Sequence, residues 1–181
     1  MTTTIHSPLD APDAGGRPSR SWLRIAAVVV VVGLVLFWIY VFAAADNYHP
    51  AGYLTDRTFP KAAEQVCAAS MHRLKALPPA HTAKNADVRA DTIVAADGIL
   101  RDMQRRLRAV VPETKDAKYI RQWIGDWSIF ISDRDEYASK LRKDPTTEYL
   151  VTQKYGSQIS ESLDNYADVN MMKSCDTPGD V

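Results

Sequence analysis

The chain of 181 residues has room for one ordinary domain, and its 22 Lys and Arg residues balance 22 Asp and Glu, so the formal net charge is zero. Binding of a nucleic acid requires a concentrated basic face, which this balance does not supply. We therefore expect no nucleic-acid partner.

The N-terminal segment MTTTIHSPLDAPDAGGRPSRS, residues 1–21, is rich in Thr, Ser, Pro, Gly and Asp and shows no apolar period. Such a segment cannot bury enough apolar surface to offset the entropy lost on ordering it. We expect residues 1–21 to be a disordered tail. The segment that follows places this tail in the cytoplasm.

Residues 22–45 are predicted to anchor the chain in the lipid bilayer. The 21 residues from Ile25 to Ala45 carry no charge, and a helix of this length reaches about 31 Å, the thickness of a bilayer core. Three arginines lie within the eight residues before this run, and the next Lys or Arg after it is Arg57. Because positive charge stays in the cytoplasm, we expect a single-pass protein of the cell membrane with an extracytoplasmic C-terminal part.

The end of the apolar run leaves a second interpretation open. The residues Ala43-Ala44-Ala45 form the small-residue pattern that a signal peptidase cuts, and the chain turns polar at Asp46. A cleaved signal has an apolar region of about 7–15 residues, however, and this run is longer. We therefore interpret the segment as an uncleaved signal-anchor.

The rest of the chain is predicted to be helical. After a tether at residues 46–57, apolar residues spaced three and four apart predict helices at 60–77, 87–111, 116–142 and 157–169. Residues 146–156 have no helical period and are expected to be extended. Four helices joined by short links indicate an all-α fold, with an extracytoplasmic four-helix bundle over residues 58–181.

The two cysteines, Cys67 and Cys175, both lie in the part predicted to be outside the membrane. Thiols meet oxidising conditions there, and the even count favours a disulfide between them. Such a bridge would close a long loop, which the chain-entropy model credits with on the order of 4–5 kcal/mol. The alternative is two unpaired buried thiols.

The predicted helix at 116–142 has a wide apolar face, which indicates contact with two neighbouring elements. Trp123, Trp127 and Phe130 lie on this face and are candidate residues for binding a small molecule or a lipid. Aromatic residues at helical spacing more often belong to a core, so core packing is the alternative.

Asp126 and Asp133 are the residues of this helix that resemble a catalytic pair. Seven residues along a helix span roughly 10.5 Å, which exceeds the separation of about 5–9.5 Å between the paired carboxylates of glycosidases. We expect both to be structural and to pair with arginines of the preceding helix or with Arg134. The sequence has no Gly-x-Ser-x-Gly motif, no phosphate-binding Gly loop and no helical histidine pair. We predict no catalytic residue, no metal site and no cofactor.

Two stretches carry a resemblance, WIGDWSIFISDRDEYA at residues 123–138 and YADVNMMKSCDTPGDV at residues 166–181. They resemble a group of small actinobacterial single-pass membrane proteins, which have one N-terminal span and a helical extracytoplasmic domain with two cysteines. The resemblance implies the same topology and supports the pairing of the cysteines. It implies no activity, cofactor or catalytic residue.

Two functional classes follow from these expectations. The first is a non-catalytic extracytoplasmic module that binds another protein of the membrane or the cell envelope. The alternative is a domain that binds a small molecule or a lipid on the aromatic face at 116–142. An enclosed apolar cavity beside the three candidate aromatics would favour the alternative, and a filled core with exposed apolar surface would favour the interaction module.

Overall fold

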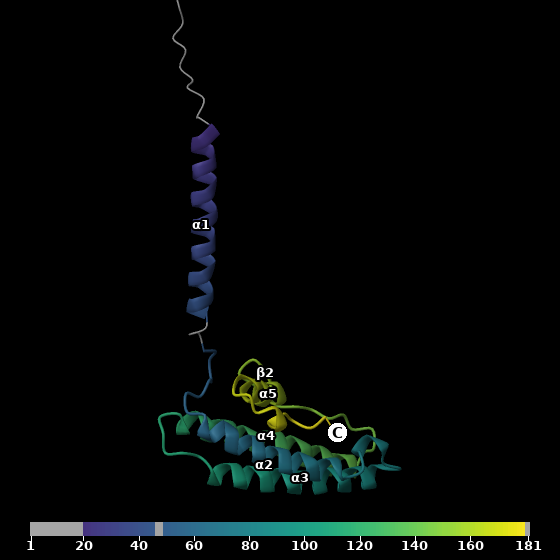
Figure 1. Cartoon of the computed structure of the whole chain (residues 1–181). Coiled ribbons are helices and arrows are strands. Elements are labelled where there is room, and N and C mark those ends of the chain that lie inside the picture. The colour runs from purple at the N-terminus through teal and green to yellow at the C-terminus, as the bar shows by residue number, and fades with distance from the viewer. Residues whose placement is uncertain (1–19, 46–48, 180–181) are drawn as a thin grey trace, which may run out of the picture. The chain divides into compact units, whose positions relative to one another are not determined.

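The computed structural model describes residues 20–45 and 49–179 (Figure 1). The described residues are mostly helical, with five α-helices, two short 3-10 helices and very little strand. The chain divides into two units, Met1–His49 and Pro50–Val181. The predicted cytoplasmic tail lies outside the described residues as far as position 19.

The first unit contains α1, Arg20–Ala45. Its segment Ser21–Ala44 has 24 residues and a mean hydropathy of 2.9, and none of it is buried inside the protein. Among the described residues, α1 is the one helix long and apolar enough to cross a membrane. Apolar side chains surround it on all sides, with Val30 68% and Leu34 58% exposed, as expected of a helix whose surroundings are lipid.

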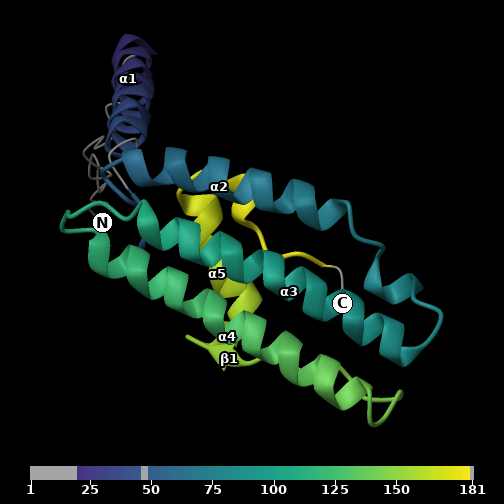
Figure 2. The same cartoon turned by 90° about the horizontal axis from the view of Figure 1, so that it is seen from below.

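In the second unit, the three long helices lie side by side in one layer (Figure 2). They are α2 (Thr58–Lys75), α3 (Ala86–Ala109) and α4 (Ala117–Leu141), and each end agrees with its predicted position to within two residues. α3 lies in the middle of the layer, and its most extensive packing is against α4. Because α4 also packs against α5, its apolar face is as wide as the sequence predicts.

Local hydrogen bonds fix where two of these helices begin. The backbone N–H and hydroxyl of Thr58 both donate to the Asp56 carboxylate at 2.8 Å. At α3, the side chain of Asn85 accepts from the backbone N–H of Val88 at 2.9 Å. Both contacts satisfy groups in the first turn that have no partner within the helix.

The segment after α4 turns back over the helix layer. Gln153–Lys154 (β1) pairs antiparallel with Ser157–Gln158 (β2), and α5, Ile159–Val169, follows directly. Tyr155 and Gly156 form the turn with φ angles of 56° and 84°, the left-handed pair that a two-residue hairpin requires. The expected extended segment thus ends in a hairpin, and α5 begins two residues later than predicted. α5 lies across one face of the layer, as Figure 1 and Figure 2 show.

The core fills the space between this layer and α5. Trp127 and Phe59 are among its largest fully buried side chains. A smaller apolar cluster around Ile93 and Tyr137 lies near the C-terminal end of α4. Val110, which the helical spacing places inward, is 36% exposed because α3 ends one residue before it.

A buried amide fixes the beginning of the second unit against the end of α5. Asn170 is fully buried; its side-chain oxygen accepts from the Leu54 backbone N–H at 2.9 Å, and its side-chain nitrogen donates to the Gly52 carbonyl at 3.0 Å. Leu54 itself is 1% exposed and belongs to the core. The C-terminal part of the segment expected to be a tether, residues 46–57, is therefore packed against the folded unit, which begins at Pro50.

Candidate functional site

The three candidate aromatics of α4 do not share one environment. Trp127 is fully buried and Phe130 is 3% exposed, and their rings meet edge to face with centroids 5.7 Å apart in the filled core. Trp123 is also nearly buried, but it lines an open groove on the surface. A ligand can therefore approach only the Trp123 end of the predicted aromatic face.

We name this depression the aromatic groove. It has a volume of about 500 Å³ and lies between α4, α5, the turn of the hairpin and residues 51–52. This volume falls within the range of small-molecule sites. Four aromatic residues line it, namely Tyr119, Trp123, Tyr155 and Tyr166. The polar side chains along it are Gln122, Asp126, Ser157, Ser162 and Asn165.

The aromatic side chains form a floor and a rim. Trp123 and Tyr166 stack with ring centroids 5.3 Å apart and an angle of 23° between their planes. The indole N–H of Trp123 donates to the Leu163 carbonyl at 3.2 Å, so its polar edge is turned away from the groove and into the protein. Tyr119 and Tyr155 are 56% and 63% exposed and form the rim.

The polar groups of the aromatic groove are only partly satisfied by the protein. Gln122 donates to the Tyr155 hydroxyl at 2.5 Å, which fixes one side of the rim. The Tyr166 hydroxyl is buried without a hydrogen-bond partner among the described residues. Burial, with a smaller contribution from the charge of Asp116, raises the pKa of Tyr166 above its ordinary value, so the hydroxyl stays protonated. Because the hydroxyl atom is itself buried, a ligand in the aromatic groove would meet the ring of Tyr166 and not its hydroxyl.

The two aspartates of α4 have partners other than those the sequence suggests. Asp126 is 7% exposed and pairs with Lys154 of β1 at 2.5 Å. Asp133 accepts from the backbone N–H and the hydroxyl of Thr152, each at 2.7 Å. The prediction that arginines hold them is wrong, because the segment after α4 folds back over this helix and places Thr152 and Lys154 beside the two carboxylates. Arg101 of α3 instead pairs with Asp135.

The arginine within the apolar face of α4 is a structural element of the core. Arg134 and Asp97 of α3 are both completely buried, and the guanidinium Nε donates to the carboxylate at 2.5 Å. Burial raises the pKa of Asp97 to about 6, more than the charge and hydrogen bond of Arg134 lower it. This pair joins α3 to α4 at the centre of the layer and is closed to any ligand.

A second open groove, which we name the tail groove, lies between the end of α2, residues 77–79 and the C-terminal segment 173–179. Its volume is about 580 Å³. Lys75, Lys173 and Asp176 place charges along it. Its apolar lining consists of Met71, Leu74, Leu77, Pro78, Pro79 and Pro178.

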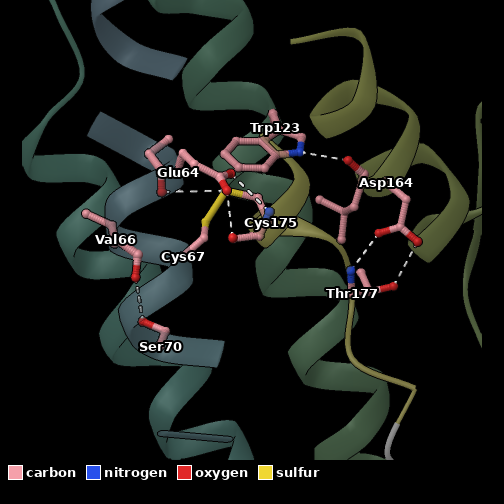
Figure 3. The surroundings of a disulfide bond; sticks show 11 residues. Glu64, Val66, Cys67, Ser70, Trp123, Asp164, Cys175 and Thr177 are labelled. Carbon is pink, nitrogen blue, oxygen red and sulfur yellow. Dashed lines mark hydrogen bonds between the residues drawn. A yellow bond between two sulfur atoms is a disulfide. The ribbon is translucent and has the colours of Figure 1, made fainter. Parts of the chain in front are cut away.

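The C-terminal segment is held in place covalently (Figure 3). The structure joins Cys175 to Cys67 of α2, as the even cysteine count predicts, with Cα atoms 5.1 Å apart. The adjacent Ser174 donates through its backbone N–H and its hydroxyl to Glu64, at 3.0 and 2.6 Å. Thr177 makes the corresponding pair of bonds to Asp164 of α5, at 2.6 and 3.0 Å. One wall of the tail groove is thereby fixed to both α2 and α5.

Sequence reasoning missed the residues that α5 and the hairpin bring to Trp123. Tyr155, Asn165 and Tyr166 lie 32 to 43 positions further along the chain, and no periodicity relates them to α4. The one local signal is the dipeptide Tyr155-Gly156, which marks a turn without showing where it folds. Within residues 20–45 and 49–179, no three His, Cys, Asp or Glu side chains gather as a metal site requires.

Comparison of the chain with protein-family models, with curated proteins and with solved structures finds no match.

Proposed function

We propose that the protein is a single-pass protein of the cell membrane whose extracytoplasmic domain, residues 46–181, binds another membrane or envelope protein without catalysing a reaction. In this proposal α1 is an uncleaved signal-anchor, and α2 to α5 form a four-helix bundle displayed outside the membrane. The length and hydropathy of α1 support the span. The arginines before the apolar run support a cytoplasmic N-terminus.

The disulfide and the resemblance both agree with this orientation. A bridge between Cys67 and Cys175 persists in an oxidising space, which lies outside the cytoplasm. The resemblance to small actinobacterial single-pass proteins implies the same placement.

The position of the exposed apolar surface is the observation that best supports a role in protein interaction. The aromatic centre of α4 is filled by its own neighbours, whereas the tail groove leaves six apolar side chains along an open surface. Leu74 and Leu77 are half-buried there, with charged side chains close by. An apolar centre with a charged margin is the composition of a protein interface. We therefore assign the partner's contact to the tail groove and expect it to insert an apolar segment.

In-cell photo-crosslinking tests this assignment. A photoreactive phenylalanine analogue replaces Leu77 in the tail groove, and the same analogue replaces Leu150 as a control. Leu150 is 70% exposed and lies outside both the tail groove and the aromatic groove. We expect the Leu77 position, and not the Leu150 position, to yield one discrete crosslinked protein of the membrane or envelope. Identical crosslinking patterns at the two positions, or none at Leu77, would contradict the assignment.

Protease treatment of intact cells tests the topology separately. External protease should remove the C-terminal domain and spare a tag at the N-terminus. Protection of both ends would contradict the proposed orientation. Recovery of a mature chain that begins at Asp46 would show instead that Ala43-Ala44-Ala45 is cleaved.

A second candidate function, small-molecule binding at the aromatic face of α4, is supported at one place. Trp127 and Phe130 are enclosed by the core, but Trp123 opens onto the aromatic groove, where several polar groups face outward. The lipid form of this alternative has less support, because the groove is open and its lining is rich in hydrogen-bonding groups.

A further inference from the structure

We propose that the aromatic groove is a binding site for a neutral glycan, that is, a short run of uncharged sugar rings. This inference goes beyond the proposed protein contact and uses a different surface of the domain. It relies on the proposed topology only for the source of the glycan, which would be the cell envelope.

The rim of the groove supplies what the apolar face of a sugar ring needs. A pyranose ring presents C–H groups on one face, and these pack against the face of an aromatic ring. Tyr119 at the start of α4 and Tyr155 in the hairpin turn are both more than half exposed. Tyrosine, which combines an apolar ring with a polar hydroxyl, is enriched at binding interfaces. Gln122, by its bond to the Tyr155 hydroxyl, links this ring to α4.

The wall of the groove supplies partners for hydroxyl groups. The one partner of the Asp126 carboxylate among the described residues is Lys154, which binds Oδ1. Its Oδ2 is therefore left to accept a hydrogen bond from a ligand in the groove. The side-chain amide of Asn165 is exposed and makes no hydrogen bond among the described residues. The carboxylate and the amide together both accept and donate, as a sugar hydroxyl does.

The charge of the groove excludes a strongly ionic ligand. Asp126 is the one charged side chain among its lining residues, and Lys154 neutralises it. The remaining polar residues are Gln, Ser, Asn and Tyr, which carry no charge at neutral pH. An anionic headgroup would meet no free cation in the groove, and a cationic peptide would have to displace Lys154 from Asp126.

A proline-rich peptide is the closest competitor, because such peptides also dock in aromatic grooves. Its backbone offers mainly carbonyl acceptors, since proline has no N–H. The indole N–H of Trp123 would be the natural donor to such a carbonyl, but it is already bonded to Leu163. Asp126 Oδ2 can accept a hydrogen bond, which a sugar hydroxyl donates and a run of prolines cannot. The observations therefore favour the glycan.

Saturation-transfer NMR and calorimetry on the full chain test the proposal. The chain is reconstituted in nanodiscs without glycolipid, because a glycoside detergent would itself compete for the groove. The probes are three neutral trisaccharides, namely maltotriose, cellotriose and triacetylchitotriose, together with an acidic trisaccharide and oligoproline. We expect at least one neutral trisaccharide to bind saturably, with transfer strongest to the C–H protons of a ring face.

Three variants locate the binding. Tyr119→Ala should weaken it about tenfold through loss of an aromatic contact, and Asn165→Ala should weaken it several-fold. Leu150→Ala, an exposed truncation outside the groove, should leave it unchanged. All three side chains are exposed, so the fold survives each change, which circular dichroism verifies.

Each contrary result would overturn the glycan assignment. Absence of binding by all neutral trisaccharides contradicts it, as does binding that neither Tyr119→Ala nor Asn165→Ala weakens. Binding of oligoproline with the same dependence on Tyr119, and no trisaccharide binding, would make the groove a peptide site. None of these results bears on crosslinking at Leu77, so the proposed protein contact stands or fails independently.

Discussion

The charged pairs Asp97–Arg134 and Asp126–Lys154 occupy opposite environments in the same domain. The first joins α3 to α4 in the middle of the layer, where both side chains are completely buried. The second joins α4 to the hairpin at the edge of the aromatic groove, where Asp126 is 9% and Lys154 31% exposed as side chains. Arginine occupies the closed site and lysine the open one.

This difference shows how one helix supplies both a structural centre and a candidate binding surface. A buried cation must be satisfied on all sides, and the guanidinium has five donors with which to achieve this. An ammonium at a surface can keep part of its hydration, so it holds a carboxylate without being locked in place. The interior pair should therefore govern stability, and the groove pair should govern the chemistry of the surface.

The largest expected effect comes from removing the interior cation. Arg134→Met should reduce the free energy of unfolding by about 3–5 kcal/mol at neutral pH, because it strands the Asp97 carboxylate in the core. Denaturant unfolding of the full chain in detergent micelles, followed by circular dichroism, measures the loss. The matched control is Arg101→Met, which breaks the half-exposed pair with Asp135 and should cost no more than about 1 kcal/mol.

The double variant Asp97→Leu/Arg134→Met checks the cause. It replaces both charges by apolar groups and should recover most of the stability, since no charge is left unpaired. A double variant as unstable as Arg134→Met alone would show that Arg134 acts through packing rather than through the carboxylate.

Removal of the disulfide should have the next largest effect, and it should affect the C-terminal segment more than the α3–α4 interface. Cys67→Ser/Cys175→Ser should reduce the free energy of unfolding by about 2–5 kcal/mol. Hydrogen exchange read by mass spectrometry should then rise in residues 173–179 and in α5, which loses a fixed neighbour. Exchange across the α3–α4 interface should change least. A uniform rise over all four helices would mean that the C-terminal segment holds the interior as well.

The pH dependence of stability should follow the interior pair. Burial raises the pKa of Asp97 to about 6 from an ordinary 3.8, and of the other charges near it, Asp135 adds to the rise and Arg101 opposes it. The folded state therefore keeps the proton over a window in which the unfolded chain has lost it. The contribution of Asp97 to the free energy of unfolding should fall as pH rises from about 4 to about 6 and stay level above that.

Arg134→Met sharpens this test, because losing the cation raises the pKa of Asp97 further. The fall in stability should then continue above pH 6, so the difference between the variant and the wild type should widen there. Taking the difference of the two proteins at each pH cancels the contributions of the other carboxylates. A difference that narrows above pH 6 would contradict the assignment to Asp97.

The sequence predicted the positions of the helices in this domain better than the side-chain contacts between them. Helix positions followed from apolar spacing and from proline at the ends, which are local signals. The interior position of Arg134 was visible only as an interruption in an apolar stripe, because no local rule pairs it with Asp97. Likewise, Lys154 reaches Asp126 only because the hairpin folds back over α4. Contacts of this kind depend on tertiary packing, which periodicity does not encode.

The smallest expected effect belongs to the groove pair. Asp126→Asn and Lys154→Gln should each cost about 0–1 kcal/mol, since the Lys154 amine can turn to solvent when its partner is lost. The coupling energy from a double-mutant cycle should fall in the same range. A coupling near that of the interior pair would mean that the hairpin closes over Asp126 more tightly than its exposure indicates.

Since Asp126→Asn keeps the fold, it also tests catalysis: a variant that retains its melting temperature but abolishes a cellular function would reopen the enzyme hypothesis. A graded loss of glycan binding at unchanged stability is the outcome that our reading of the aromatic groove expects, because the asparagine side chain keeps an acceptor oxygen but loses the charge that holds Lys154.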